Sequence, residues 1–162
     1  MKTNTVNRTS TGQALESVMM ETLQTFFQLR ALGIRLGAVS PWGGGYWGLL
    51  RILKIEGPRT VPQLARARSV SRQRMQKLAD EMVKDGVVKL VDNPAHRRSK
   101  FLQLTPEGEQ MLQELTARVA REAEQLAQDM DEQELRTTVN ILKELRYKLE
   151  KHLMTQFPRY ED

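Results

Sequence analysis

Apolar residues recur at helical spacing through both ends of the chain. Near the N-terminus they step by four, four, three and three positions, at Leu15, Met19, Leu23, Phe26 and Leu29. Two C-terminal series alternate three- and four-residue steps, with a break at Asp131, where Glu134 completes a capping-box spacing. Such spacing gives each helix one apolar stripe. The pattern predicts a helix within residues 12–39 and two helices over residues 106–157, the first starting after Thr105 and reaching Met130.

The middle of the chain has shorter apolar series separated by turn residues. Thr60 and Gln63 are spaced as a capping box, and Ser71 is the next N-cap candidate. The helix after Ser71 has one apolar stripe at i, i+3, i+4 and i+7, formed by Met75, Leu78, Ala79 and Met82. Gly86 is placed to end that helix in the left-handed conformation. We therefore expect two short helices joined by a sharp turn.

A β-hairpin is predicted directly after this helix pair. Residues 87–91 and 100–104 are rich in strand-forming side chains, and the loop between them carries Asn-Pro punctuation. His96, Arg97 and Arg98 lie at or near the tip of that loop. The predicted fold class is mainly α with a small β-hairpin wing, which is a winged helix-turn-helix with additional helices at both ends.

The outer side of the second short helix suits DNA. Opposite its apolar stripe it presents five basic or amide side chains: Arg72, Gln73, Arg74, Gln76 and Lys77. In a major groove, Arg and Lys pair with guanine O6 and N7, and Gln pairs with adenine. A solvated helix surface is the alternative, because charge-rich faces are common. The basic hairpin loop favours DNA, since it would flank the same face and could place an arginine in the minor groove.

Residues 47–112 resemble the winged helix-turn-helix of the MarR family of bacterial transcription regulators. The similarity runs in order through WGLLRIL, VPQLA, SVSRQRMQKLADEMVKDGVV and the wing NPAHRRSKFLQLTPEG. The resemblance implies a dimeric regulator whose Ser71–Lys77 segment lines the major groove, while Arg98, with Arg97, enters the minor groove. Its DNA-contact candidates are Thr60, Ser71, Arg72, Gln73, Arg74, Gln76, Lys77, His96, Arg97, Arg98 and Lys100.

This chain departs from the family pattern at three positions. His96 stands where family wings usually carry an acidic residue, so the neighbouring arginine would be held differently. Arg68 replaces an aliphatic side chain, and Ser69 replaces the usual turn glycine. These departures bear on the packing of the first short helix and leave the fold class unchanged.

The long terminal helices are expected to mediate dimerisation. Two leucine-lined helices after a small DNA-binding unit have little left in the same chain to pack on, although an intramolecular helical hairpin is an alternative. A two-fold dimer would imply a pseudo-palindromic operator. The predicted organisation is a flexible leader (1–11), an N-terminal dimerisation helix (12–39), the winged helix-turn-helix (40–105) and C-terminal dimerisation helices (106–157).

An aromatic segment precedes the winged helix-turn-helix. Residues 40–50 combine three consecutive glycines with Trp42, Tyr46 and Trp47, and these rings are either core anchors or walls of an apolar ligand pocket. The resemblance implies small aromatic effectors near the junction of the DNA-binding and dimerisation parts. The ligand-binding candidates are Phe26, Arg30, Trp42, Tyr46 and Trp47.

Composition and charge narrow the function classes. The chain has no cysteine and two histidines, so thiol chemistry and a multi-histidine zinc site are not expected. Residues 51–100 carry 13 basic and 5 acidic groups, whereas residues 101–162 carry 8 and 13, as expected if only the middle faces a polyanion. Neither a phosphate-binding glycine loop nor a nucleophile–base pair is evident. An enzyme and a cofactor are therefore not expected.

These observations together predict a cytoplasmic, homodimeric, sequence-specific DNA-binding regulator. A signal peptide or an apolar run of about 18 residues is not seen, so no membrane association is expected. The expected role is a repressor released by a small ligand, for which the resemblance implies an aromatic compound. The alternative is a winged-helix protein-interaction module whose basic face binds an acidic partner.

Overall fold

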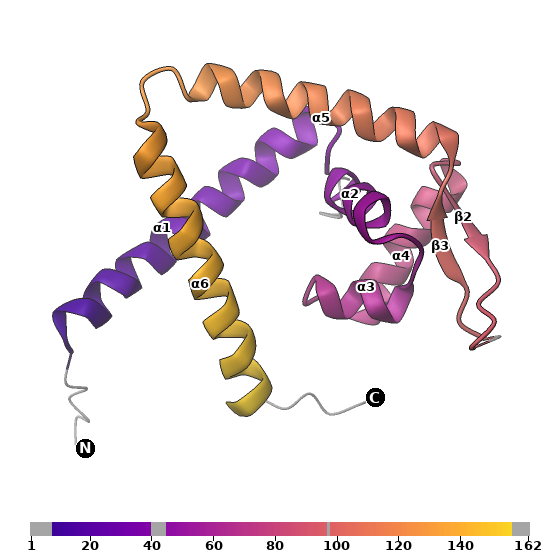
Figure 1. Ribbon diagram of the computed structural model, residues 1–162, viewed down its shortest axis with the longest axis horizontal. Helices are drawn as coiled ribbons and strands as arrows, with labels where there is room; N and C mark the ends of the chain where they lie inside the picture. The colour runs from indigo at the N-terminus through magenta and orange to yellow at the C-terminus, as the bar shows by residue number, and fades with distance from the viewer. Residues whose placement is uncertain (1–7, 40–44, 97, 157–162) are drawn as a thin grey trace. The chain divides into compact units, whose positions relative to one another are not determined.

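The computed structural model describes residues 8–39, 45–96 and 98–156, within which the chain forms six helices and three strands. The elements, shown in Figure 1, are α1 (Ser10–Arg35), α2 (Tyr46–Glu56), β1 (Arg59–Thr60), α3 (Val61–Ala67), α4 (Arg72–Lys84), β2 (Val88–Val91), β3 (Phe101–Leu104), α5 (Pro106–Leu126) and α6 (Glu132–Gln156). The predicted fold class, a mainly α winged helix-turn-helix with a small hairpin, is confirmed. The chain divides into two compact units at residue 119, within α5.

The three strands form one antiparallel sheet in the order β1-β3-β2. The hairpin pairs Val88 with Leu104 and Val91 with Phe101, so each strand is one residue shorter than predicted. The two-residue strand β1, which the sequence analysis missed, places Thr60 opposite Phe101. This strand is too short to produce an alternating pattern in the sequence, and it forms because β3 offers a free edge beside the extended N-cap of α3.

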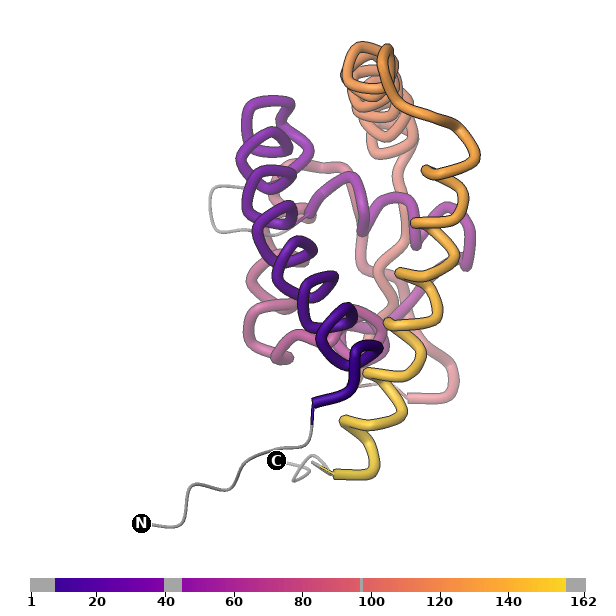
Figure 2. The backbone as a smooth tube through the Cα atoms, turned by 90° about the vertical axis from the view of Figure 1, so that its left-hand side faces the viewer, coloured from indigo at the N-terminus to yellow at the C-terminus, as the bar shows by residue number. Residues whose placement is uncertain are grey.

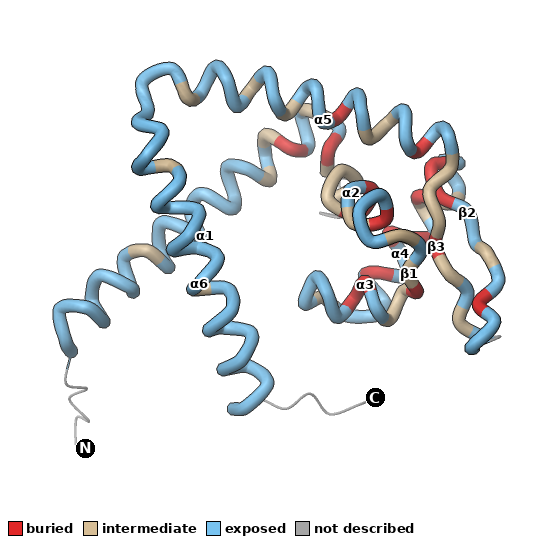
Figure 3. The backbone as a smooth tube through the Cα atoms, viewed as in Figure 1, coloured by how far each residue is buried: buried red, intermediate tan, exposed pale blue. Residues whose placement is uncertain are grey.

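One core holds the winged unit together, by which we mean α2, α3, α4, the sheet and residues 106–119 of α5. The helices α3 and α4 pack on each other, α2 packs on β3, and α4 packs on β2. All four residues of the predicted α4 stripe are buried, together with residues from the other elements (Figure 3): Leu49, Leu50, Leu53, Leu64, Val87, Val88, Leu102 and Leu115.

Side-chain caps fix where the helices of the winged unit begin. The hydroxyl of Thr60 accepts from the Gln63 amide while the Gln63 side chain accepts from the Thr60 amide, which confirms the predicted capping box. Gly86 ends α4 with a φ of 74°, as expected. Thr105 caps α5 by accepting from the Gly108 amide at 3.0 Å, and it donates to the Gly86 carbonyl at 2.7 Å. The hydroxyl of Thr105 therefore ties the start of α5 to the exit of α4.

The N-terminal helix differs from the prediction at both ends. It begins at Ser10, inside the range predicted as a leader, because the Thr9 hydroxyl accepts from the Gly12 amide. It is continuous to Arg35 (Figure 2) and so ends inside the predicted range of residues 12–39. Gly37 adopts a φ of 73°, and the Gly33 carbonyl accepts from the Ala38 amide at 2.8 Å. These two glycines therefore end α1.

The C-terminal unit contains the end of α5 and the whole of α6. The helix α5 ends at Leu126 rather than reaching Met130, and a turn leads to Asp131, whose side chain accepts from the Glu134 amide at 2.8 Å as predicted. None of the residues of α6 is buried. None of the described helices is both long enough and apolar enough to cross a membrane.

Candidate nucleic-acid interface

The amino-terminal end of α4 is presented to solvent by its cap. The Ser71 hydroxyl accepts from the Arg74 amide at 3.3 Å, which fixes the first turn. Because Met75 and Leu78 face the core, the side chains between them and before them point outward. Five of the predicted DNA contacts are exposed on this side: Arg72, Gln73, Arg74, Gln76 and Lys77.

The turn between α3 and α4 accommodates two of the departures from the family pattern. Ser69 has a φ of 51°, a conformation that costs a residue with a side chain more than it costs glycine. The guanidinium of Arg68 lies against the start of α2, where a Cβ added at Gly48 would stand 2.4 Å from an Arg68 nitrogen. The long arginine thus occupies space that Gly48 leaves open.

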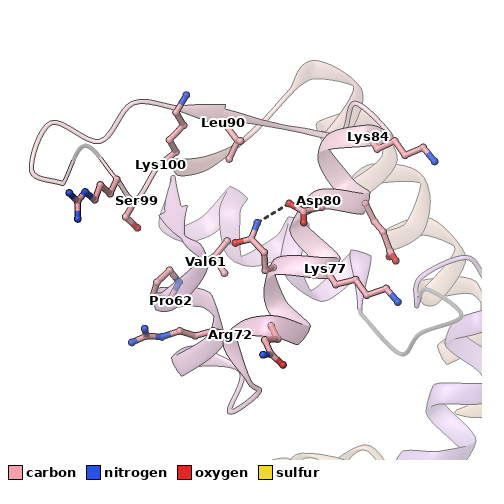
Figure 4. A pocket seen from close by; sticks show the side chains of 13 residues that line it. Val61, Pro62, Arg72, Lys77, Asp80, Lys84, Leu90, Ser99 and Lys100 are labelled. Carbon is pink, nitrogen blue, oxygen red and sulfur yellow. Dashed lines mark hydrogen bonds between the residues drawn. The ribbon is translucent and has the colours of Figure 1, made fainter. Parts of the chain in front are cut away.

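The wing approaches α4 and completes a groove of about 980 Å³. Figure 4 shows side chains from α3, α4 and both sides of the wing around this groove. Six predicted DNA contacts line it: Arg72, Gln73, Gln76, Lys77, Arg98 and Lys100. Val61, Pro62 and Leu90 add apolar surface, and Asp80 and Glu81 add carboxylates. The structure therefore gathers basic, amide and apolar groups in one concave surface.

Asn93 organises the wing loop, a role that the sequence analysis did not assign. The Asn93 side chain is buried, at 6% exposure, and it donates to the Ser99 carbonyl at 3.0 Å. Its amide oxygen accepts from the Ala95 N–H at 3.1 Å. The loop also has backbone bonds from His96 N to the Asn93 carbonyl and from Ser99 N to the His96 carbonyl. An asparagine side chain that accepts from the N–H two residues later forms an Asx-turn, and the Asn-Pro pair in the sequence could have predicted this turn.

The remaining predicted contacts are placed differently from those in the groove. Arg74 and His96 are exposed but do not line it, and Arg97 lies outside the described residues. Lys100 lines it and lies 3.9 Å from the Asp92 carboxylate. Thr60 is 6% exposed and its hydroxyl caps α3, so it has little surface to offer a phosphate, and its contact with DNA stays a prediction.

Tyr46 and Trp47, two of the three described aromatic residues among the ligand candidates, have partners inside the winged unit. The Tyr46 hydroxyl donates to the Asp85 carboxylate at 2.7 Å, at the end of α4. Partial burial, reinforced by that carboxylate, raises the pKa of Tyr46 far above its usual range. The Trp47 indole N–H donates to the Thr116 hydroxyl of α5 at 3.0 Å, and the Arg51 guanidinium lies over its ring. These contacts favour the interpretation of Tyr46 and Trp47 as packing anchors.

The other ligand candidates are not gathered into the same place. Phe26, on α1, is 56% exposed and meets the ring of Phe27 edge-on with centroids 5.6 Å apart. Arg30 is half-buried on the same helix, and Trp42 lies outside the described residues. Within the described ranges, no group of three acidic or histidine side chains could hold a metal ion.

Comparison with known sequences agrees with this geometry. Residues 39–99 match the MarR family model, and the match runs from α2 through β2 into the loop of the wing. The chain is 35% identical over 123 residues to the uncharacterised protein Rv2011c of Mycobacterium tuberculosis, covering 74% of this chain and 85% of that protein. It is 32% identical to YdgG of Bacillus subtilis, an uncharacterised HTH-type transcriptional regulator, over 62% of this chain and 67% of that protein.

Solved structures share the fold at low sequence identity. The MarR family transcription regulator SP03579 superposes with a TM-score of 0.70 at 21% identity, covering 88% of this chain and 95% of that chain. The PcaV transcriptional regulator of Streptomyces coelicolor, crystallised with its natural ligand, superposes with a TM-score of 0.64 at 18% identity, covering 79% of this chain and 89% of that chain.

Proposed function

The chain belongs to the MarR family of DNA-binding transcription regulators, and we propose that it acts as a dimeric, sequence-specific repressor that a small ligand releases from DNA. The groove between α4 and the wing is the observation that carries this proposal. An α-helix with its side chains is about 10–12 Å across, which matches the width of a B-DNA major groove, about 12 Å. The outer side of α4 would enter the major groove while Arg98 reaches the adjacent backbone or minor groove.

The charge distribution supports a polyanionic partner for this face. The segment that contains the groove carries 13 basic and 5 acidic groups, whereas the segment after it is acidic. Contacts from lysine and arginine to phosphates provide sequence-independent affinity, and amides with base edges provide selectivity. The presence of Gln73 and Gln76 among the cations favours base reading over neutralisation alone.

The exposed apolar residues of the terminal helices support a dimer. Leu23 and Phe26 of α1 and Leu149 and Leu153 of α6 are all more than 40% exposed in the single chain. A second copy would cover these surfaces and, by two-fold symmetry, set two α4 helices about 34 Å apart. The operator is then a pseudo-palindrome whose half-sites are one helical turn apart.

Ligand control is proposed to act through α2. Tyr46 contacts the end of α4 and Trp47 contacts α5, so a ligand that displaces Tyr46 would change how α4 is held, and one that displaces Trp47 would loosen α2 from α5. An effector that prefers the displaced form weakens DNA binding by its differential affinity, typically about 1–3 kcal/mol. The structural likeness to PcaV, which was solved with its own ligand, supports testing such an effector.

Selection from a random DNA pool, followed by fluorescence anisotropy, tests the DNA-binding part of the proposal. We expect a pseudo-palindromic consensus, bound at least about 1,000-fold more tightly than a scrambled duplex. Arg72→Ala should weaken binding to the selected site, whereas Lys89→Ala removes the same charge from an exposed position outside the groove and should have a smaller effect. If selection gives no consensus, and both substitutions change the affinity for random DNA equally, an acidic protein partner is favoured instead.

Transcription from a promoter that overlaps the selected site tests repression and release. The protein should lower the transcript level, and 4-hydroxybenzoate, used as a phenolic acid probe, should restore it while lowering DNA affinity in the anisotropy assay. A panel of related aromatic acids without effect on either readout would contradict aromatic ligand control.

A further inference from the structure

Gln76 and Asp80 form a hydrogen-bonded pair on the exposed side of α4. The Gln76 Nε2 donates to Asp80 Oδ1 at 2.8 Å, and both residues line the groove between α4 and the wing. Figure 4 shows this bond as the dashed line that ends on Asp80. The two residues are four apart, so their side chains lie on the same side of the helix.

The pairing fixes which end of the Gln76 amide faces outward. An ionised carboxylate only accepts hydrogen bonds, so the atom of Gln76 that meets Asp80 must be the NH₂ group. The amide oxygen Oε1 therefore points away from Asp80. One of the two amide hydrogens is used by the bond, which leaves one N–H donor and one oxygen acceptor for a ligand.

A donor beside an acceptor is the complement of adenine. In the major groove adenine presents N7 as an acceptor and N6–H as a donor, whereas guanine presents two acceptors, N7 and O6. Oε1 of Gln76 would accept from adenine N6–H but would face the oxygen of guanine without a hydrogen between them. The oriented amide should thus select adenine over guanine.

We infer that Gln76 and Asp80 act as one adenine-reading pair, in which Gln76 contacts the base and Asp80 is a positioning residue that holds the amide. This inference rests on the proposed entry of α4 into the major groove. A free glutamine on an exposed helix samples several rotamers, and immobilising such a side chain on binding reduces affinity by roughly 2- to 12-fold. Asp80 lowers that loss because the amide is already oriented.

The location of Asp80 argues for a role beyond helix stability. An i, i+4 pair of this kind adds a little stability wherever it occurs on a helix. Asp80, however, places a carboxylate in the groove that faces a polyanion, where a charge of this sign opposes binding. If Asp80 orients the Gln76 amide, that benefit would offset the unfavourable charge of its carboxylate in the groove.

The test compares base preference at single positions of the selected site. Wild-type protein should prefer adenine over guanine by roughly 5- to 140-fold at one symmetric pair of positions, and Gln76→Ala should abolish that preference there and nowhere else. Replacing this adenine by 7-deazaadenine, which lacks N7, or by purine, which lacks the 6-amino group, should weaken the wild type and leave Gln76→Ala unchanged.

Two substitutions at Asp80 separate positioning from charge. Asp80→Asn removes the charge but retains an oxygen that accepts from Gln76, so it should keep the adenine preference while binding all DNA more tightly. Asp80→Ala removes both, and its preference should fall by roughly 2- to 12-fold at the same positions. Circular dichroism should show the same helix content for both variants, since Asp80 is exposed.

The outcomes distinguish this inference from the proposed function. If wild-type protein selects no sequence, the proposed function fails and the adenine pair fails with it. If it selects a site but Gln76→Ala alters no position, or if Asp80→Ala and Asp80→Asn have the same base preference, regulation of DNA stands and the adenine pair is wrong.

Discussion

The helices of the winged unit and the terminal helices have the same spacing of apolar residues, but they differ in how far those side chains are buried within one chain. Leu50, Met82 and Leu102 of the winged unit are completely buried within one chain, whereas Leu23 of α1 and Leu153 of α6 are each 50% exposed. A helical stripe predicts that one face of a helix will be covered, and it does not identify what covers it. The short helices beside the sheet find that cover in their own chain, whereas the long terminal helices leave their apolar residues exposed in the single chain, as the proposed dimer requires.

The largest expected effect comes from the buried side of this comparison. Leu50→Ala leaves a cavity in the core of the winged unit and should lower the free energy of unfolding by about 2–5 kcal/mol. Chemical denaturation should give this loss at every protein concentration. Leu23→Ala, the same truncation on α1, should instead show a loss of stability that grows as the protein is diluted. If both variants depended on concentration to the same extent, the two regions would not differ in what buries their apolar side chains.

A charge on the α1 stripe should dissociate the proposed dimer. Leu23→Glu would bury an unpaired carboxylate against the partner, at a cost of about 3 kcal/mol, which raises the dimer dissociation constant roughly 100-fold. Gln24→Glu adds the same charge to the neighbouring exposed position and serves as the control. Sedimentation should give twice the chain mass of 18.7 kDa for the wild type and the control, and a lower mass for Leu23→Glu.

Within the winged unit, Asn93 should act on DNA binding through the wing. Asn93→Ala removes the bonds to Ala95 and Ser99, which costs about 1–3 kcal/mol of local stability and loosens the loop that carries Arg98. DNA affinity should fall severalfold at unchanged helix content. In an Arg98→Ala background the same substitution should cost little affinity, and additive losses would show that Asn93 does not work through Arg98.

The smallest expected effect concerns Tyr46 and depends on pH. Tyr46→Phe removes the bond to Asp85 and should cost about 0.5–1.5 kcal/mol near neutral pH. The folded-state pKa of Tyr46 is raised, so its contribution is complete below the usual tyrosine pKa of 10.0 and declines as the pH rises above it, where only the unfolded chain ionises. The difference in free energy of unfolding between variant and wild type, measured by denaturation, should therefore shrink as the pH rises. A difference that stays constant would contradict this assignment.

Much of the winged unit could be predicted because its signals are local. The Thr60–Gln63 capping box, the Ser71 cap and the i, i+3, i+4, i+7 stripe of α4 each depend on residues a few positions apart. The hairpin followed from strand-forming runs on either side of a polar loop. The basic loop of the hairpin was expected to flank the same face as α4, and Arg98 of that loop lines the groove beside α4.

The parts that could not be predicted depend on contacts between distant residues or on competition between signals. Thr60 has a hydroxyl that could bind a phosphate, but the pairing of β1 with β3 buries this residue. The apolar spacing did not fix the end of α1 within residues 12–39, where Gly37 turns the chain just after Arg35. The sequence left both a core and a pocket open for Tyr46 and Trp47, and their contacts with Asp85 and Thr116 favour the core.

The stoichiometry of the protein on its selected DNA site tests the central claim most directly. Sedimentation of the complex, with the protein titrated against a duplex that contains one pseudo-palindromic site, should give two chains per duplex with no intermediate of one chain. Leu23→Glu should lose this complex at concentrations where Gln24→Glu keeps it. One chain bound per duplex at full affinity would contradict the account, because the winged unit would then read DNA without the second copy that the terminal helices are proposed to recruit.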